Sequence, residues 1–227
     1  EMVNNPLIPE TDAKVTGSPI EISNPQSQDM AYLRTSLLVS ALPVISNNIK
    51  KGEKDIAVFE IGNVFKRLNN QVSTFSDFEE KKRLLLLITG KKQSRQWYSG
   101  ETEYDIFDLK GLINVFLSKF SLDNVLNDSY NSIQNMNYDY HFTVNFKGSS
   151  FGDGGKVSKS VLKMFDIHQH VYSFEFDFEI FRKLSGERRT FKELLKYPKV
   201  NRDFAFLFNK SINYTSVKDF ILKESSD

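Results

Sequence analysis

Two adjacent cations, Lys66 and Arg67, lie where a predicted strand runs into a turn, in the stretch VFEIGNVFKRLNN from Val58 to Asn70. Positive side chains at the end of a strand could hold a phosphate, because charge-assisted hydrogen bonds to phosphate oxygens are strong. The alternative is that both residues are surface charges on a strand that binds no ligand. The first hypothesis describes a nucleotide-binding enzyme, and the second describes a part of one whose chemistry is gone.

Three carboxylates, Glu175, Asp177 and Glu179, alternate with phenylalanines in the segment FEFDFEIF, Phe174 to Phe181. On a strand, this alternation places the acids on one face and the aromatic rings on the other. A row of carboxylates could bind Mg²⁺ or divide acid and base roles between its members. The pattern favours a simpler interpretation, in which the acids face solvent and the rings are buried.

Two further motifs have a chemical and a structural interpretation. The sequence GDGG, Gly152 to Gly155, could cradle a phosphate with its backbone N–H groups. No Lys-Ser/Thr pair follows it in P-loop register, so a tight turn between strands is favoured. His168 and His170 form an HxH pair that could bind a metal if a third ligand came from elsewhere. Exposed loop histidines are the preferred interpretation of this pair.

Cations cluster near residue 195, where a boundary between two domains is expected: Arg188, Arg189, Lys192, Lys196, Lys199 and Arg202. Each could release a counterion from a nucleic-acid backbone. Glu187 and Glu193 are interspersed among them, so a solvated linker between domains is an equal alternative. The lone Trp97, in QWYSG, is expected to pack against other side chains rather than to stack on bases.

The composition is that of a folded soluble protein, since 40% of the 227 residues are hydrophobic and 26% are charged. Lys and Arg total 30 against 29 Asp and Glu, so any nucleic-acid contact must come from a local patch. The absence of cysteine excludes disulfides, thiolate metal sites and a cysteine nucleophile, and predicts a cytoplasmic protein. The run Leu84 to Ile88 is too short to span a bilayer, so no membrane contact is expected. The missing initiator methionine indicates an excised piece of a longer protein.

Helices interspersed with mostly antiparallel strands predict an α+β fold. A first helix is expected to start at Ser27 as its N-cap and to be kinked or divided at Pro43. Its apolar residues recur at helical spacing: Met30, Leu33, Leu37, Leu38, Ala41 and Ile45. Ile56–Leu68 and Lys82–Gly90 predict a long hairpin with a loose connection, in which Gly62 marks a bulge or a close backbone approach.

The second half of the chain continues this alternation. A helix in EYDIFDLKGLINVFLSKF has one apolar stripe: Phe107, Leu112, Ile113, Phe116, Leu117 and Phe120. Strands are expected at Tyr140–Phe146 and Val171–Phe178, with a short helix at Ser158–Phe165 before the second. From Tyr197 a Pro-led strand precedes an amphipathic helix, and these two elements alone cannot bury a core. A second, small domain is therefore expected to be cut short here.

Four segments in this order resemble landmarks of one family, the beta subunit of bacterial-type phenylalanyl-tRNA synthetase. They are ISNPQSQDMAYLRTSLL (Ile22 to Leu38), AVFEIGNVF (Ala57 to Phe65), FDLKG (Phe107 to Gly111) and YPKVNRDFAFLF (Tyr197 to Phe208). The resemblance implies that residues 1–195 form a class II synthetase-like antiparallel sheet flanked by helices. It implies that residues 196–227 are the truncated start of a ferredoxin-like anticodon-binding domain.

The resemblance also allows a test of whether class II chemistry survives. Active class II sites resemble Phe-Arg-x-Glu at the end of the first hairpin strand, and the arginine holds the ATP α-phosphate. Here the register gives Phe65, Lys66, Arg67 and Leu68, so the acid is missing and lysine replaces arginine. In the strand that is glycine-rich in active relatives, Asp177 and Glu179 replace glycines ahead of Arg182, and their charges would repel nucleotide phosphates.

The function that the resemblance implies is a non-catalytic scaffold, with no catalytic, metal or cofactor-binding residues and no cofactor bound by this chain. It would pair with the catalytic alpha subunit and help to position tRNA(Phe) for aminoacylation. The parent complex, which uses ATP and magnesium, would be a heterotetramer of two alpha and two beta subunits. Two alternatives remain: a degenerate but active class II adenylating enzyme, and a stand-alone RNA-binding module.

The resemblance assigns residues to two surfaces of this scaffold. Subunit contacts are expected at Pro6, Asn24, Pro25 and Arg34. For Arg34, an ion pair with a local acid is an equal alternative. Contacts to tRNA are expected at Arg188, Arg189, Lys196 and Arg202.

Overall fold

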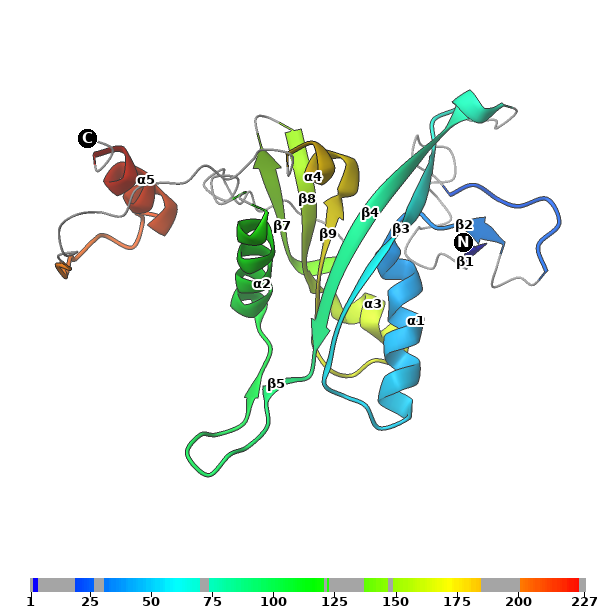
Figure 1. The fold of residues 1–227 in the computed structure, drawn as a ribbon. Coiled ribbons are helices and arrows are strands. Elements are labelled where there is room, and N and C mark those ends of the chain that lie inside the picture. The colour runs from blue at the N-terminus through cyan, green and yellow to red at the C-terminus, as the bar shows by residue number, and fades with distance from the viewer. Residues whose placement is uncertain are drawn as a thin grey trace. The chain divides into compact units, whose positions relative to one another are not determined.

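The computed structural model describes residues 2–3, 19–26, 31–69, 74–120, 122, 137–146, 149–184 and 201–224. The chain divides into two compact units, Glu1–Glu187 and Arg188–Asp227, and each is described by itself. The first unit contains a five-stranded antiparallel sheet in the order β3-β4-β9-β8-β7 (Figure 1). Its strands are β3 (Ile56–Arg67), β4 (Phe78–Thr89), β7 (Tyr138–Phe146), β8 (Ser149–Val157) and β9 (Val171–Asp177). This architecture confirms the predicted α+β class.

Strands β3 and β4 form the predicted long hairpin, in register from Ile56 opposite Thr89 to Arg67 opposite Phe78. Its connection includes a 3-10 turn, Phe75–Asp77, so the predicted loose connection is confirmed for the residues that the structure describes. The leucine-rich part of β4 is buried because β4 is an inner strand, with β3 on one side and β9 on the other. The register passes through Gly62 without a shift, so of the two predictions for this glycine the bulge is wrong.

Helix α1 (Leu37–Lys50) begins nine residues later than predicted, because Ser36 rather than Ser27 is its N-cap and accepts a hydrogen bond from Leu38 N at 3.1 Å. Leu33, expected in this helix, lies instead in the short strand β2 (Tyr32–Leu33), which pairs with β1 (Met2–Val3). Ser27 and Met30 lie outside the described residues. Pro43 does not divide the helix: its ring is exposed, while the neighbouring turns bury Leu38, Leu42 and Ile45.

Helix α2 (Ile106–Lys119) starts at an N-cap, Asp105, which forms a capping box with Asp108. Its buried residues are spaced four apart: Leu109, Ile113 and Leu117. The predicted apolar stripe was partly wrong, because Phe107 and Leu112 lie around the helix from this row and are exposed. The predicted short helix is confirmed as α3 (Lys159–Met164), capped by Ser158.

The glycine cluster is neither a turn nor a phosphate loop, because Gly152–Gly155 lie inside strand β8. A methyl group added at Gly154 would lie 2.1 Å from the carbonyl oxygen of Ser173, and one at Gly152 would lie 2.6 Å from a ring carbon of Phe174. The cluster therefore allows β8 to pack closely against β9. The turn prediction failed because glycine is favoured both in tight turns and where two strands pack closely, and the sequence does not distinguish these cases.

The sheet has a hydrophobic cluster on each face (Figure 1). On one face, α2 packs over aromatic residues of β7 and β9 that include Phe142, Phe174 and Phe176. On the other face, α1 and α3 pack over Leu85 and Leu87 of β4. Helix α4 (Phe178–Leu184) follows β9 directly.

The second unit contains helix α5 (Tyr214–Glu224), which confirms the amphipathic helix expected after Tyr197. Residues 201–209, expected to form a strand, have none, since a strand requires a partner and the described part of this unit offers no other. None of the described helices combines the length and the apolar character that a membrane crossing requires.

Candidate functional site

The sheet face under α1 carries Glu175 and Asp177 of the motifs compared above, and Lys66 lies at its outer edge, near the tip of β3. Lys66 and Arg67 are consecutive strand residues, so their side chains leave on opposite faces of the sheet. They therefore cannot hold one phosphate together. The next residue, Leu68, donates its backbone N–H to the carbonyl oxygen of Asp77 at 2.8 Å, and its side chain is exposed. No acid stands at this position.

Glu175 lies in the middle of this face and is half-buried, with its carboxylate bonded within the chain, which corrects the prediction that it faces solvent. Its carboxylate accepts hydrogen bonds from Ser36 Oγ at 2.7 Å and from Leu37 N at 3.1 Å. It thus holds the first residues of α1 against β9. Burial raises the pKa of Glu175, and the carboxylate of Asp153, its neighbour on β8, raises it further.

Asp177 and Glu179 do not continue a row of acids, because β9 ends at Asp177. Asp177 accepts hydrogen bonds from the backbone N–H groups of Glu179 and Ile180, both at 3.1 Å, and so caps α4. Glu179 lies in α4 and forms an ion pair with Arg182 at 2.9 Å. The predicted row of three carboxylates is therefore wrong. Alternation continues past Asp177 in the sequence, but the cap turns the chain into a helix.

Arg34 occupies the other side of the face, over β3, and is only 1% exposed. Its guanidinium pairs with Glu60 Oε1 at 2.6 Å and donates to the carbonyl oxygen of Asn63 at 2.9 Å. A methyl group added at Gly62 would lie 2.1 Å from Arg34 Nη2, so this glycine admits the arginine. The predicted close approach at Gly62 is confirmed. The ion pair that the sequence left open for Arg34 is present within the chain.

A polar pair on the same face was missed from the sequence. His141 on β7 is buried, and its Nε2 lies 3.1 Å from Oδ2 of Asp153. The hydroxyl of Thr143, which is opposite Asp153 across the strands, is buried without a hydrogen-bond partner. The alternation of β7, with His141, Thr143 and Asn145 on one face, was the signal in the sequence that could have found this row.

The described residues offer no metal site, since no group of three or more acids and histidines among them could hold an ion. His168 is exposed and lies 3.3 Å from a carboxylate oxygen of Asp166, and His170 is also exposed. The preferred interpretation of this pair as exposed loop histidines is confirmed.

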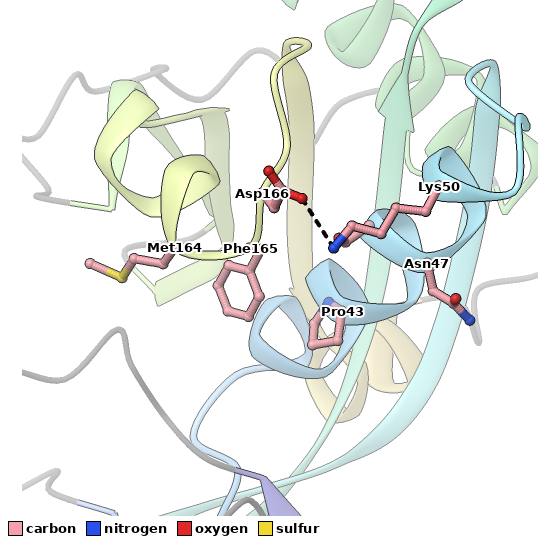
Figure 2. Close-up of a pocket in the computed structure, with 7 residues that line it drawn as sticks. Pro43, Asn47, Lys50, Met164, Phe165 and Asp166 are labelled. Carbon is pink, nitrogen blue, oxygen red and sulfur yellow. Dashed lines mark ion pairs between the residues drawn. The ribbon is translucent and has the colours of Figure 1, made fainter.

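A pocket of about 330 Å³ lies between α1 and the end of α3 (Figure 2). Pro43, Met164 and Phe165 give it apolar walls, and Asn47, Lys50 and Asp166 give it polar ones. Lys50 and Asp166 form an ion pair at 3.1 Å across it, and this hydrogen-bonded lysine lowers the pKa of Asp166. The single carboxylate of the pocket is already paired with Lys50, so its lining suits packing against an apolar group better than catalysis.

The residues predicted for partner and tRNA contacts are only partly described. Asn24 and Pro25 are exposed, as is Arg202 in the second unit. Pro6, Arg188, Arg189 and Lys196 lie outside the described residues. The structure therefore brings none of these residues together into one surface that can be described.

Comparison with known proteins agrees with this geometry. A beta subunit of phenylalanine–tRNA ligase from Syntrophotalea carbinolica is 30% identical over 203 residues, which are 89% of this chain and 25% of that protein. The corresponding subunit of Chlorobium chlorochromatii is 29% identical in an alignment that covers 97% of this chain and 28% of that protein. The chain thus spans about a quarter of the length of these relatives.

One solved structure shares the fold. The pyrrolysyl-tRNA synthetase of Desulfitobacterium hafniense superposes with a TM-score of 0.50 at 13% identity, over 73% of this chain and 53% of that one. At this identity the likeness concerns the fold alone, and it supports the class II synthetase-like sheet. The family described as phenylalanyl tRNA synthetase beta chain CLM domain matches residues 1–178. On this match, the chain belongs to that phenylalanyl-tRNA synthetase beta chain family.

Proposed function

We propose that the chain is a non-catalytic scaffold within phenylalanine–tRNA ligase. In this proposal it pairs with the catalytic alpha subunit in the cytoplasm and helps to position tRNA(Phe) for ATP-dependent aminoacylation. The complex would contain two alpha and two beta subunits and would use magnesium at the alpha subunit. The relatives' names support the place of the chain in this enzyme, and the chain spans only about a quarter of their length.

The observation that carries the proposal is the occupation of the nucleotide face by the chain's own groups. The first residues of α1 lie on Glu175, and Arg34 covers Gly62. A nucleotide entering here would meet these side chains and the buried carboxylate. Two like charges 4 Å apart repel by about 4 kcal/mol at an effective dielectric near 20, so Glu175 and Asp153 would oppose ATP phosphates.

The surfaces of the scaffold follow from the predicted residues. Subunit contacts are proposed around Pro6, Asn24 and Pro25. Arg34, which is buried and paired with Glu60, would stabilise this part of the chain rather than contact the partner directly. Contacts to tRNA are proposed at Arg188, Arg189, Lys196 and Arg202. Residues 196–227 would begin a ferredoxin-like anticodon-binding domain, and helix α5 is the part of it that supports this proposal.

Co-purification tests the proposal most directly. The tagged chain, extended to the full beta subunit, is co-expressed with the alpha subunit, and the complex is assayed for aminoacylation of tRNA(Phe). We expect a stable complex that aminoacylates. Replacement of Asn24 and Pro25 by lysines should weaken assembly. Replacement of the exposed Lys119 and Lys163 by glutamates should not. Failure of the unaltered subunits to associate would refute the scaffold role.

Pyrophosphate exchange separates the two alternatives. The chain alone is expected to show no ATP–pyrophosphate exchange, and measurable exchange would favour an active adenylating enzyme instead. Tight, salt-dependent tRNA binding by the chain without the alpha subunit would favour a stand-alone RNA-binding module.

A further inference from the structure

The sequence assigned Trp97 to packing, and the structure contradicts this. Trp97 is 95% exposed and Tyr98 is 64% exposed. Their rings contact each other edge to face, with centroids 5.2 Å apart. Large aromatic side chains usually bury most of their surface, so a pair left open at one place indicates a binding surface.

The backbone holds this pair at the end of a projecting hairpin. Strands β5 (Lys91–Gln93) and β6 (Thr102–Glu103) pair in antiparallel fashion and extend away from the main sheet (Figure 1). At the tip, Gln96 and Ser99 exchange backbone hydrogen bonds of 3.0 and 3.4 Å, which leaves Trp97 and Tyr98 as the two residues of the turn. Gln93 Nε2 also donates to Ser99 Oγ at 2.8 Å. The aromatic pair is thus presented by an ordered turn.

The strand that leads into the pair is positively charged, whereas the returning strand carries the acids Glu101 and Glu103. The segment KKQSRQWY, Lys91 to Tyr98, contains three cations and no acid. Arg95, two residues before Trp97, is exposed. Lys91 and Lys92 form surface ion pairs with Glu101 and Asp108. Exposed ion pairs of this kind contribute little and can be exchanged for another anion.

We propose that this hairpin tip, named here the WY tip (Arg95, Trp97 and Tyr98), stacks on an unpaired nucleotide of RNA. Aromatic faces stack on every base, and neighbouring cations neutralise the phosphates on either side. The positively charged segment from Lys91 to Tyr98 favours a polyanion as the partner over an apolar pocket of another protein. The proposal rests on the proposed role in tRNA positioning and gives that role a contact outside the predicted tRNA residues.

A second hairpin tip in the same chain provides the matched control. Phe75, at the β3–β4 connection, is 90% exposed and lies 6.0 Å from the ring of Phe78. Three acids, Asp77, Glu79 and Glu80, are close to it in sequence, and Arg67 and Lys66 lie opposite Phe78 and Glu79 across the hairpin. It therefore has a single exposed ring beside both acids and cations, instead of the Trp97–Tyr98 pair, and it should not bind RNA.

The test uses the fluorescence of Trp97, which is the single tryptophan of the chain. Titration with a single-stranded oligoadenylate should quench this fluorescence in a saturable way, because the stacked base contacts the indole directly. Raising the salt concentration should weaken the quenching. Unchanged fluorescence at saturating oligonucleotide, with binding seen by anisotropy of a labelled strand, would overturn the proposal.

Variants then separate stacking from charge. Trp97→Ala should weaken anisotropy-measured binding about tenfold, whereas Trp97→Phe should restore most of it. Arg95→Ala should reduce the slope of log affinity against log salt by about 0.7. Phe75→Ala should leave both quantities unchanged. Equal losses in Trp97→Ala and Phe75→Ala, or no loss in either, would overturn the assignment to the WY tip.

Assembly with the alpha subunit distinguishes a failure of this inference from a failure of the proposed function. Trp97→Ala should assemble normally and lose only RNA affinity. If it prevents assembly, the WY tip is a protein contact and the RNA proposal is wrong. If the unaltered complex assembles and aminoacylates but Trp97→Ala has full tRNA affinity, the inference alone fails. If the unaltered subunits do not assemble, the scaffold role fails, and the oligoadenylate result still decides the inference.

Discussion

The two faces of the five-stranded sheet are built on the same strands but hold different kinds of side chain. The face under α2 is aromatic: Phe142 and Phe174 stack at 5.3 Å, and Phe174 meets Phe176 at 4.7 Å. The face under α1 carries Glu175, Asp153 and Arg34, each with a polar partner within the chain. Both faces bury apolar side chains, and the second also carries polar groups that partner one another where the proposed function places a lost nucleotide site.

In the proposed scaffold, this difference explains how a binding face loses its ligand without losing the fold. Both faces supply apolar burial that stabilises the sheet. The polar face can then change as long as its polar groups find partners. Glu175 finds them in Ser36 and the N-terminus of α1, and Arg34 finds them in Glu60 and Asn63. Substitutions on the two faces should therefore have different consequences.

The largest effect is expected on the aromatic face. Phe174→Ala removes a ring that is fully buried between Phe142 and Phe176, and it should lower the free energy of unfolding by about 3–5 kcal/mol. Denaturant unfolding followed by circular dichroism measures this loss. The exposed Phe75, replaced by alanine, should change the same quantity by less than about 0.5 kcal/mol. Similar losses in both variants would mean that the aromatic face is not the core.

The next effect concerns the glycine beneath Arg34. Gly62→Ala should destabilise the chain by about 1–3 kcal/mol, because the added methyl group overlaps a buried guanidinium that is held by Glu60 and Asn63. The clash depends on Arg34, so the cost of Gly62→Ala should be smaller when Arg34 is already alanine. A double-mutant cycle measures this coupling. Additive effects would show that the glycine serves another purpose.

A smaller effect of opposite sign is expected at Glu175. Because burial raises its pKa in the folded state, the folded chain binds a proton more readily than the unfolded one, and stability falls as the pH rises from the unfolded pKa to the folded pKa. Glu175→Gln keeps an oxygen that can accept from Ser36 and Leu37 and has no such pH dependence. It should be more stable than the unaltered chain at neutral pH, with a difference that disappears below the unfolded pKa, near 4.5.

Thermal unfolding of both proteins between pH 4 and pH 8 (about the range of carboxyl and histidine titration) measures this difference. Asp139→Asn, at an exposed acid on β7, is the matched control and should leave the pH dependence unaltered. If Glu175→Gln is less stable than the unaltered chain at neutral pH, the charged carboxylate stabilises the fold, and the expected destabilisation is wrong.

The smallest effect is expected at the strand tip. Lys66→Ala should change stability by less than about 0.5 kcal/mol, because Lys66 is exposed. Aminoacylation by the assembled complex should also be unchanged. A loss of ATP affinity in this variant would show that Lys66 still holds a phosphate, and the two faces would then differ less than we infer.

Strong and local patterns in the sequence predicted much of the fold. The β3–β4 hairpin could be predicted because its strands are long and β-branched or leucine-rich, and α3 because Ser158 is a clear N-cap. The start of α1 was misplaced because Leu33 continues the helical spacing by coincidence. Its position in β2 depends on pairing with Met2 in β1, a contact that helical periodicity does not predict.

The candidate site was harder to predict because its geometry depends on contacts distant in sequence. Glu175 is covered by a helix that starts about 140 residues earlier, so alternation alone assigned it to solvent. Asp177 ends its strand by capping α4, although the alternation of aromatic and acidic residues continues past it. Trp97 stands in a turn of two residues, where nothing in the sequence distinguishes an exposed ring from a buried one.

Direct measurement of ATP binding tests the central claim that the chain itself fills the nucleotide face. Equilibrium dialysis of the chain against labelled ATP with magnesium should show no binding above that of a matched protein without a nucleotide site. The variant with Glu175→Gln and Arg34→Ala, in which both internal contacts are weakened, should bind no better, because the acid of the Phe-Arg-x-Glu motif is still missing at Leu68. Saturable binding of ATP by the unaltered chain would contradict the account.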